Sequence, residues 1–378
     1  MTSLRILHVY RTYYPDPTGG LQEAIRQIAT ASALLNIESR VFTLSPLPIP
    51  AEIKRPEASV FRCRSWASPA SCDVGGLSAI KKFSECTNWA DIIHYHFPWP
   101  FADLLHLIVR PTKPAIITYH SDIIKKQLLG LGYIYFSRWM LRSMTAIVAT
   151  SPAYARTSSV LQNPNIRNRV RVIPLGIDES TYPRQGNEGV IQRLFLDDDE
   201  PFFLFIGVLR HYKGLHTLLQ ASNSVNARIV IAGSGSEEVN LKKQALQLNL
   251  KNVIFAGQIS DAEKVALLNR CRALVLPSQL RSEAFGMVLV EASMFGKPMI
   301  CCEINTGTSF VNIDGETGLV VPPESPVNLA SAINLLATDH ALALKYGNAA
   351  RARYEKLFSA KALGQAYSDL YREVLKSQ

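Results

Sequence analysis

The chain has 378 residues, of which 47% are hydrophobic and 19% charged, and its formal net charge is +9. This length is too great for one typical domain and fits two domains, each with its own core. The composition is that of a soluble globular enzyme, and no stretch reaches the roughly 18 uncharged apolar residues that a membrane span needs. Since the N-terminus also resembles no secretory signal, the sequence predicts a cytoplasmic protein.

The excess positive charge lies entirely in the first half of the chain. Residues 1–178 hold 20 Lys and Arg against 11 Asp and Glu, whereas residues 179–378 hold 20 of each. This asymmetry predicts an acidic partner for the first half, such as a membrane surface or a phosphorylated acceptor. Nucleic acid is disfavoured as a partner because no interleaving of aromatic and basic residues accompanies the charge.

Short apolar segments alternate with helix-length amphipathic segments along the whole chain. In the first half, strands are expected at 4–10, 38–44, 91–97, 115–120, 145–150 and 170–174, with a helix at 21–35. In the second half, strands are expected at 202–208, 227–233, 252–257, 273–277 and 298–303. Strands that are apolar nearly throughout and separated by helices indicate parallel sheets covered on both faces. The sequence therefore predicts an α/β protein with two Rossmann-like, doubly wound domains.

Residues 175–201 break this alternation with Gly, Pro and charge, and are the best candidate for a linker between the domains. The chain from about residue 326 onward is expected to be helical. In doubly wound sheets, ligands bind beyond the carboxyl ends of the strands. Candidate functional residues are therefore sought in the loops that follow the strands.

In the first half, two such loops carry polar or small residues. Gly19 and Gly20 precede a helix, where glycine lets the backbone approach a ligand and the helix N-terminus favours an anion. A plain turn is the alternative, and the missing third glycine of a dinucleotide fingerprint counts against a nicotinamide enzyme. His120 ends the strand expected at 115–120, where a buried structural histidine is the simpler interpretation.

A metal site is disfavoured by the cysteines and the histidines alike. The six cysteines form no C-x-x-C pair, so neither a disulfide framework nor a cysteine zinc site is expected. His94 and His96 share one face of a strand and could bind zinc together with His120, but no supporting carboxylate can be assigned. The sequence therefore predicts no metal.

In the second half, the first loop carries two cations. Arg210 and Lys213 lie between a strand and a helix, and their charge suits a diphosphate; a solvated basic turn is the alternative. Gly233 follows the next strand and permits close approach of a ligand or of backbone.

The loop after the strand at 252–257 offers contacts for a flat base. Ile259 could face the base, while Asp261 and Lys264 could bond to its edge. Helix capping by Asp261 is an equally good explanation.

Residues 282–298 carry two glutamates eight residues apart in apolar surroundings. Glu283 is expected in a loop, and Glu291 about a turn and a half into a helix that begins near Gly286. The free backbone amides of residues 286–288 would seat a phosphate, so that each carboxylate could accept hydrogen bonds from the hydroxyls of a sugar. A salt-bridged surface pair is the alternative, but it fits poorly with the apolar neighbours of Glu291.

In this order and spacing, the motifs resemble glycosyltransferase family 4, whose members are retaining enzymes of the GT-B fold, with two Rossmann-like domains facing a cleft. The resemblance rests on Glu-x7-Glu within SEAFGMVLVEA, the Gly19–Gly20 loop, His120, the loop of Arg210 and Lys213, and DGETGLVVPP. It covers essentially the whole chain and is strongest over residues 202–323. It implies an acceptor-binding domain at 1–178, a sugar-nucleotide-binding domain at 179–358, and a final helix at 359–378 that returns to the first domain.

The resemblance also implies roles for individual residues. Glu283 should contact the transferred sugar, Glu291 the ribose, and His120 the region of the reaction centre. The residues implied in catalysis are His120, Arg210, Lys213 and Glu283. Those implied in donor binding are Gly19, Gly20, Gly233, Ile259, Asp261, Lys264, Phe285, Gly286, Met287, Val288 and Glu291. No metal or other cofactor is implied, since the sugar nucleotide is a substrate. One departure is Val208, which occupies the position of the usual Arg, so that Arg210 substitutes for it from two residues further on.

The loop INTGTSFVN at 304–312 replaces the usual Gly-Gly-Pro-Glu and, with GVLRHYKGL, resembles mannosyl- and rhamnosyltransferases of bacterial O-antigen-type polysaccharide assembly. The expected reaction transfers mannose, or a 6-deoxyhexose such as rhamnose, from a GDP-sugar to a lipid-linked polysaccharide acceptor. The alternatives are a UDP-sugar-dependent transferase and a sugar-nucleotide epimerase or hydrolase of the same architecture.

Residues 125–144 combine apolar and aromatic residues with Lys125, Lys126, Arg138 and Arg142. A helix that lies on an anionic bilayer has this composition, although a partly buried domain helix is the alternative. The sequence thus predicts a protein peripheral to the inner face of the cytoplasmic membrane.

Overall fold

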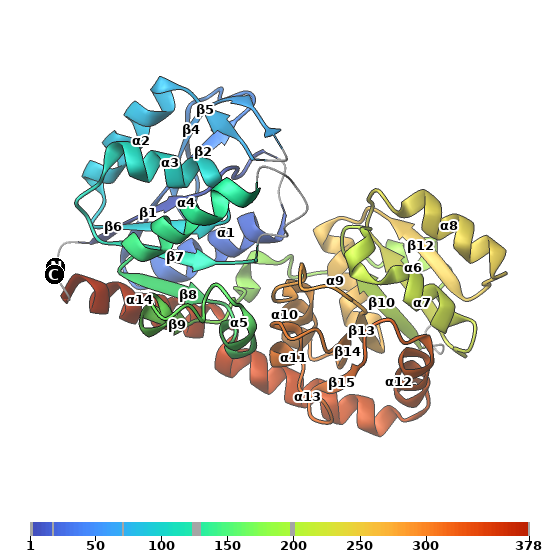
Figure 1. Cartoon of the computed structure of the whole chain (residues 1–378). Helices are drawn as coiled ribbons and strands as arrows, with labels where there is room; N and C mark the ends of the chain where they lie inside the picture. The colour runs from blue at the N-terminus through green and yellow to red at the C-terminus, as the bar shows by residue number, and fades with distance from the viewer. Residues whose placement is uncertain (1–2, 17–18, 70–71, 123–129, 197–200, 377–378) are drawn as a thin grey trace. The chain divides into compact units, whose positions relative to one another are not determined.

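The computed structural model describes residues 3–16, 19–69, 72–122, 130–196 and 201–376, without the side chains of 130–132 and 134. The chain forms two compact units (Figure 1). Unit 1 comprises Met1–Gly176 and Ala360–Gln378, and unit 2 comprises Ile177–Ser359. The division thus falls two residues before the position chosen from the sequence, and the last helix belongs to unit 1.

Unit 1 is built on a nine-stranded sheet in which β5 pairs with β4 and the other strands have the order β3-β4-β2-β1-β6-β7-β8-β9. The strands are β1 (Leu4–Val9), β2 (Ile37–Ser45), β3 (Glu52–Lys54), β4 (Ser59–Ala67), β5 (Val74–Gly75), β6 (Ile92–Phe97), β7 (Ala115–Tyr119), β8 (Ala146–Ala149) and β9 (Val170–Val172). All pairs are parallel except those of β3 and β5 with β4. The six strands expected from the sequence are present, whereas β4 is missed because Arg62 and Arg64 interrupt its apolar run.

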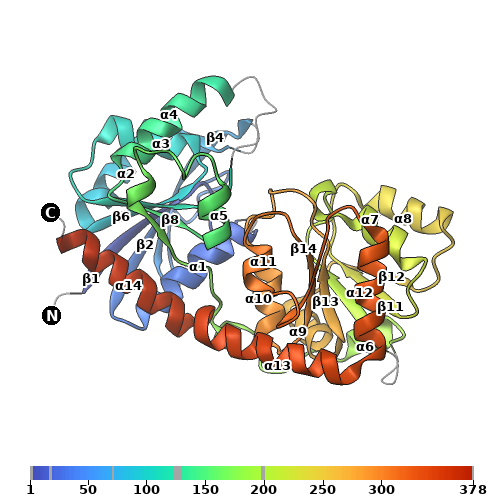
Figure 2. The ribbon, with the colours of Figure 1, turned by 60° about the horizontal axis from the view of Figure 1, so that its bottom comes forward.

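The helices of unit 1 include one from the far end of the chain. They are α1 (Gly20–Ala33), α2 (Leu77–Trp89), α3 (Pro100–Val109), α4 (Gly130–Ser143), α5 (Pro152–Thr157) and α14 (Ala360–Lys376). Helix α14 lies beside α1 (Figure 2). Its apolar stripe, Leu363, Tyr367, Leu370, Tyr371 and Val374, shares a core with Ile28 of α1 and Ile6, Ile92 and Ile116 of the sheet.

The face of the sheet that α1 and α14 cover changes character along the strands. Side chains of a strand alternate between faces, so His8 shares this face with Ile6, His94 and His96 with Ile92, and Thr118 and His120 with Ile116. The parallel register aligns His8 with His94 and His96 with Thr118. The face is therefore apolar at the amino ends of β1, β6 and β7 and polar at their carboxyl ends.

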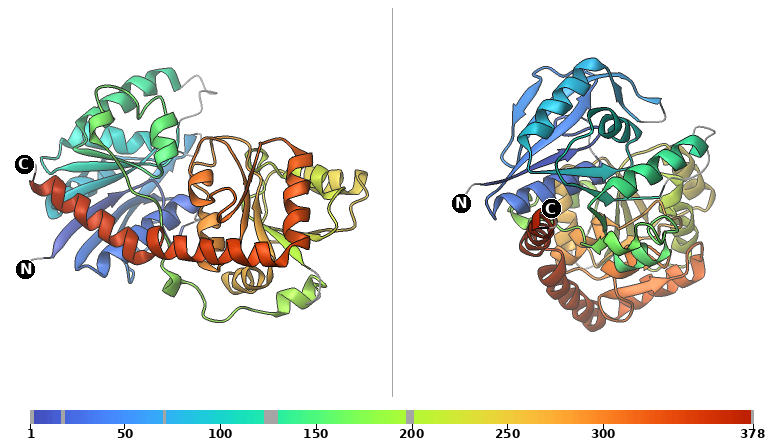
Figure 3. Two further views of the ribbon diagram at one scale, coloured as in Figure 1. Left: turned by 90° about the horizontal axis from the view of Figure 1, so that it is seen from below. Right: turned by 60° about the vertical axis from the view of Figure 1, so that its left-hand side comes forward.

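Unit 2 is built on a six-stranded, fully parallel sheet with the order β12-β11-β10-β13-β14-β15. The strands are β10 (Phe202–Ile206), β11 (Arg228–Ala232), β12 (Val253–Gly257), β13 (Ala273–Leu276), β14 (Met299–Cys302) and β15 (Gly318–Val321). The helices are α6 (Gly189–Arg193), α7 (Leu215–Ser222), α8 (Glu238–Gln247), α9 (Asp261–Arg270), α10 (Met287–Met294), α11 (Thr308–Val311), α12 (Pro326–Thr338) and α13 (His340–Leu357). Helices α12 and α13 pack next to β15 (Figure 3).

The sheet of unit 2 is fully parallel, that of unit 1 is parallel apart from β3 and β5, and helices flank both, which confirms the prediction of two Rossmann-like domains. Within the described residues, no helix is long and apolar enough to cross a membrane. All six cysteines are free, and Cys301 and Cys302 lie in β14.

Candidate functional site

The candidate residues of unit 2 gather at the carboxyl edge of its sheet. Arg210 and Lys213 follow β10, Gly233 follows β11, Lys264 lies in α9 after β12, and Glu283 follows β13. The carboxyl edge is where parallel α/β sheets bind ligands. The loops that were chosen from the sequence in this half of the chain therefore lie together at one edge of the sheet.

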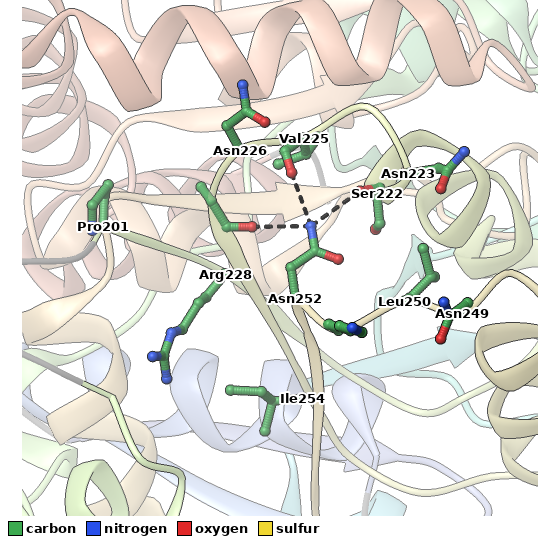
Figure 4. Close-up of a pocket in the computed structure, with 12 residues that line it drawn as sticks. Pro201, Ser222, Asn223, Val225, Asn226, Arg228, Asn249, Leu250, Asn252 and Ile254 are labelled. Atoms are coloured by element: carbon green, nitrogen blue, oxygen red, sulfur yellow. Dashed lines mark hydrogen bonds between the residues drawn. The ribbon is translucent and has the colours of Figure 1, made fainter.

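A hollow in unit 2 lies at the opposite edge. It is lined by Pro201, Arg228 and Asn252, which precede or begin β10, β11 and β12 (Figure 4). The amide nitrogen of Asn252 donates to the carbonyl oxygens of Ser222, Val225 and Ala227, at 3.0, 2.9 and 3.3 Å. Asn252 thus ties the strand to the loop after α7, and its role here is structural.

Lys213 and Glu283 form an ion pair at the candidate site. Ser278 Oγ also donates to Glu283 Oε2, at 3.2 Å, and the side chains of Lys213 and Glu283 are only 11% and 12% exposed. Burial lowers the pKa of Lys213, but the charge of Glu283 and its hydrogen bond raise it more, so the net pKa lies above the usual 10.5. The sequence indicated both charges but missed Ser278 and the pairing.

A tight turn brings Lys213 to Glu283. Lys213 ends the 3₁₀ helix η4 (His211–Lys213), and Gly214 follows it with a φ of 69°. A Cβ at Gly214 would lie 1.9 Å from the carbonyl oxygen of Pro277, so only glycine fits there. Arg210, at the start of this turn, is exposed and has no ion-pair partner among the residues that the structure describes. Its guanidinium is therefore available to an anion.

Glu291 has two partners inside unit 2. Lys264 Nζ donates to Glu291 Oε1 at 2.9 Å, and the hydroxyl of Tyr182 donates to the same oxygen. Lys264 Nζ also lies 4.8 Å from the centre of the Tyr182 ring and 3.4 Å from Asp261 Oδ1. Burial lowers the pKa of Lys264, but Glu291 raises it more, so that the net pKa lies above the usual value.

These contacts change the expectation for Glu291. Of the alternative, a salt-bridged surface pair, the ion pair is present, between Glu291 and Lys264, but it does not lie on the surface, because the two side chains are only 14% and 18% exposed. The partners that a carboxylate in apolar surroundings requires are nevertheless supplied by the protein itself. Tyr182 was missed because it lies 109 residues before Glu291, in the segment read as a linker.

Helix α10 begins between the two glutamates, as the sequence predicts. Gly286 precedes its first residue with a φ of 84°, a conformation that favours glycine. Across the described part of the chain, no group accepts a hydrogen bond from the amides of Gly286, Met287 or Val288. Phe285 is 4% exposed and packs edge-to-face on Phe358, so its side chain belongs to the core and only its backbone is available to a ligand.

Two further donor-binding candidates of unit 2 differ in their surroundings. Gly233 has a φ of 131°, and a Cβ there would lie 2.0 Å from the carbonyl oxygen of Gly207. Contact with backbone therefore explains this glycine without a ligand. Ile259 is half-buried, and Asp261 is 78% exposed, so both are open to a partner.

In unit 1, the loop before α1 is held by Gln22. Its Oε1 accepts from the Gly19 amide at 3.0 Å, and its Nε2 donates to Thr12 Oγ1 at 2.6 Å. A Cβ at Gly20 would meet nothing within 4 Å, so no described protein group requires glycine at this position.

His120 belongs to a buried cluster of histidines in unit 1. Its Nε2 lies 3.1 Å from His96 Nδ1, and His96 Nε2 lies 3.1 Å from His8 Nδ1. The His94 ring stacks on His96, but its two nitrogens form hydrogen bonds elsewhere, with the Tyr371 hydroxyl at 2.9 Å and Thr118 Oγ1 at 2.7 Å. Burial lowers the pKa of His8 and of His120 to about 3, so both rings are neutral at pH 7.

The three histidines whose nitrogens converge are not the trio considered from the sequence. Within the described residues, His8, His94 and His96 bring one nitrogen each to within 4.8 Å of the others, with His8 in place of His120. However, both His94 nitrogens bond to Tyr371 and Thr118, and His8 and His96 bond to each other. The geometry therefore favours hydrogen bonds over a shared zinc ion.

The segment proposed to touch a membrane is described only in part. Residues 125–129, with Lys125 and Lys126, lie outside the described residues, and the rest falls mainly in α4. On α4, Arg138 and Arg142 are exposed, and Tyr135 and Trp139 are 74% and 38% exposed.

Comparison with known proteins identifies the family. Residues 18–181 match the family model described as Glycosyltransferase Family 4, and residues 188–353 match the model for glycosyl transferases group 1. The chain is 44% identical over 360 residues to D-rhamnosyltransferase WbpZ of Pseudomonas aeruginosa, a match that covers 94% of this chain and 93% of that protein. The chain belongs to glycosyltransferase family 4. The expected resemblance is thereby confirmed, and the protein is a glycosyltransferase.

Other relatives agree with this assignment. The glycosyltransferase is 39% identical over 375 residues to O-antigen chain mannosyltransferase C of Escherichia coli, covering 99% of this chain and all of that protein. Among solved structures, sucrose-phosphate synthase of Thermosynechococcus elongatus superposes with a TM-score of 0.80 at 24% identity, covering 99% of this chain and all of that one. Anabaena HepE, solved with UDP and glucose, gives 0.76 at 19% identity, covering 97% and 99%. These structures confirm the GT-B fold.

Proposed function

We propose that this glycosyltransferase moves mannose, or a 6-deoxyhexose such as rhamnose, from a GDP-sugar to a lipid-linked polysaccharide acceptor with retention of the anomeric configuration. The choice of sugar is supported by the similarity to a D-rhamnosyltransferase and to an O-antigen mannosyltransferase over nearly the full length. The donor site is supported by one observation: Glu283 and Glu291, paired with the buried Lys213 and the partly buried Lys264, flank amides at the start of α10 that have no acceptor among the described residues.

In this proposal the diphosphate binds to Lys213, Arg210 and the amides of residues 286–288. Cations and a helix N-terminus are the groups that bind phosphate oxygens best. A carboxylate has about four lone-pair sites. Glu283 and Glu291 can therefore keep their protein partners and still accept hydrogen bonds from the transferred sugar and from the ribose. The Ile259 side chain and the exposed Asp261 carboxylate would meet the face and the edge of guanine.

The bond that breaks joins the anomeric carbon to the β-phosphate oxygen, and the electron pair leaves with GDP. The acceptor hydroxyl attacks from the same face, and its proton passes to a phosphate oxygen of the donor. Lys213, Arg210 and the start of α10 stabilise the negative charge that develops on GDP. Removing one such fixed donor costs about 3 to 4 kcal/mol of barrier. No step requires a metal, so activity should survive a chelator.

Lys213→Ala tests the diphosphate assignment, with Lys242→Ala as a matched control. Lys242 lies in the same unit and is 51% exposed; it forms an ion pair with Glu238 one turn away and lies 5.9 Å from the centre of the Phe255 ring. We expect kcat of Lys213→Ala to fall about 100- to 1000-fold. The control should stay within about twofold of wild type. Turnover of folded Lys213→Ala within a few-fold of wild type would refute the assignment.

The nucleotide and the reaction class require separate experiments. In thermal-shift measurements, GDP and GDP-mannose should raise the melting temperature more than UDP and UDP-glucose. A larger shift with UDP would favour the alternative of a UDP-sugar donor. Incubation with GDP-mannose and no acceptor should release sugar slowly; rapid release of free sugar or of an epimer would favour a hydrolase or an epimerase.

We further propose that the enzyme works at the inner face of the cytoplasmic membrane. The supporting observations are the exposed Arg138, Trp139, Arg142 and Tyr135 of α4 and the positive charge of the first half of the chain. Binding to anionic but not to neutral liposomes at low salt is expected. Equal binding to both, or none, would remove the membrane proposal and leave the donor site untouched.

A further inference from the structure

A chain of three hydrogen-bonded imidazoles runs from the carboxyl end of β7 into the core of unit 1. Its members are His120, His96 and His8, and each contact has ring centroids 5.4 Å apart and nitrogens 3.1 Å apart. At that centroid separation, 3.1 Å is close to the shortest distance that two imidazole nitrogens can have. Each pair of nitrogens must therefore lie almost on the line between the ring centres, which is the geometry of a linear N–H···N bond.

The two ends of this chain have different surroundings. His8 Nε2 is fully buried and has no hydrogen-bond partner among the described residues. His120 Nδ1 also has no described protein partner, but it is not among the fully enclosed unpartnered atoms, and His120 is 7% exposed. The inner end is therefore closed by protein, whereas the outer end can meet a ligand.

Three neutral rings can arrange their protons in only two ways that form both bonds. In one, each ring carries its proton on Nδ1 and donates outward, from His8 to His96 and from His96 to His120. In the other, each ring carries its proton on Nε2, and the Nε2–H of His8 points into the core without an acceptor. A buried N–H without an acceptor is rarer in proteins than an unpaired acceptor. The first arrangement is therefore the stable one.

We infer that His8 and His96 are positioning residues that hold the proton of His120 on Nδ1, so that His120 meets its ligand as a hydrogen-bond donor and not as a base. The ligand atom that this arrangement recognises is an oxygen with a free lone pair, such as a sugar hydroxyl. Only the identity of the ligand, the transferred sugar, rests on the proposed function. The proton positions follow from unit 1 alone.

Nitrogen NMR of the wild-type protein tests the proton positions directly. Protein labelled with ¹⁵N-histidine distinguishes protonated from unprotonated ring nitrogens, and the His120 signals are those that His120→Asn removes. We expect Nδ1 to be protonated and Nε2 unprotonated in His120, His96 and His8. A His120 ring with its proton on Nε2 would overturn the inference, whether or not the protein transfers mannose or rhamnose.

Variants separate positioning from simple support of the core. His96→Leu removes the bonds to His120 and His8, whereas Thr118→Val is an isosteric control that removes the bonds to His94 and Tyr367 on the same buried face. For His96→Leu we expect kcat to fall by up to about 100-fold with little change in donor KM, and the His120 nitrogen shifts to move. His96→Asn, which can donate from near the Nδ1 position, should recover part of kcat. Equal kcat and unchanged His120 shifts in His96→Leu and Thr118→Val would show that His96 is merely structural.

Asn and Gln at position 120 distinguish the two ring nitrogens of His120. The Asn amide reaches the position of Nδ1 and the Gln amide that of Nε2. If His120 donates from Nδ1, His120→Asn should retain more activity than His120→Gln. The reverse order would contradict a role for Nδ1.

Discussion

The ion pair of Lys213 and Glu283 makes a quantitative prediction about the stability of unit 2. Both side chains are nearly buried, at 11% and 12% exposure, so removing one partner leaves a charge with little water around it. Breaking a buried pair in this way costs about 3 to 5 kcal/mol, and the remaining exposure places this pair near the lower end, at about 3 kcal/mol. Lys213→Met and Glu283→Leu should each lose about this much.

The double variant should lose far less than the sum of the single variants. Replacing both charges by apolar groups of similar size leaves no uncompensated charge and is often close to neutral. The coupling free energy between the two positions should therefore be at least about 2 kcal/mol. Because Glu283 raises the pKa of Lys213 above 10.5, the contribution of Lys213 is fully present at neutral pH and is lost as the pH rises through the pKa of Lys213.

Urea unfolding followed by two signals measures these values. A two-domain protein need not unfold in one step. All four tryptophans, Trp66, Trp89, Trp99 and Trp139, lie in unit 1, so their fluorescence follows that unit and provides an internal control. Far-UV circular dichroism follows both units and should show the change. Single-variant costs that simply add in the double variant, or a coupling below about 0.5 kcal/mol, would refute the reasoning.

Four further substitutions test other contacts. Gly20→Ala should leave the free energy of unfolding unchanged or raise it by up to about 1 kcal/mol, as followed by thermal melting, because a Cβ meets no described atom. A raised donor KM in the same variant would place a ligand at this position. Gly233→Ala should abolish soluble expression through its clash with Gly207, whereas Gly315→Ala, where φ is 70° but space is open, should cost about 1 kcal/mol by thermal melting. Tyr182→Phe removes a hydrogen bond to the Glu291 carboxylate and should raise the KM for the sugar nucleotide about tenfold in steady-state assays. An unchanged KM would contradict a contact between Glu291 and the ribose.

Most of the parallel strands could be predicted because they are largely apolar runs; β10 and β13, for example, are apolar throughout and almost fully buried. Strand β4 could not, since Arg62 sits in its middle and becomes buried only by pairing with Asp16 at 3.1 Å and with the carbonyl oxygen of Leu47 at 2.9 Å. Those partners lie in loops far along the chain. The local hydrophobic pattern therefore cannot indicate that Arg62 is buried.

The candidate site divides in the same way. The residue types and their strand-end positions indicated Lys213, Glu283, Lys264 and Glu291. Their pairing depends on the order of strands in the sheet, which brings the loops after β10 and β13 to one place. The need for glycine at position 233 likewise proved to come from the carbonyl oxygen of Gly207, the residue that follows the neighbouring strand β10.

By itself, the sequence determined that this protein has two doubly wound domains, where its strand-end loops lie, and which family it belongs to. It could do so because the alternation of apolar strands with helices and the order of the motifs can be read along the chain. Only the tertiary structure decided which charges are paired, and that His8, His96 and His120 form one chain under helix α14. Hydrogen bonds and ion pairs form between atoms a few ångströms apart. That proximity is set by the register of strands and by a helix from the far end of the chain, which no short stretch of sequence encodes.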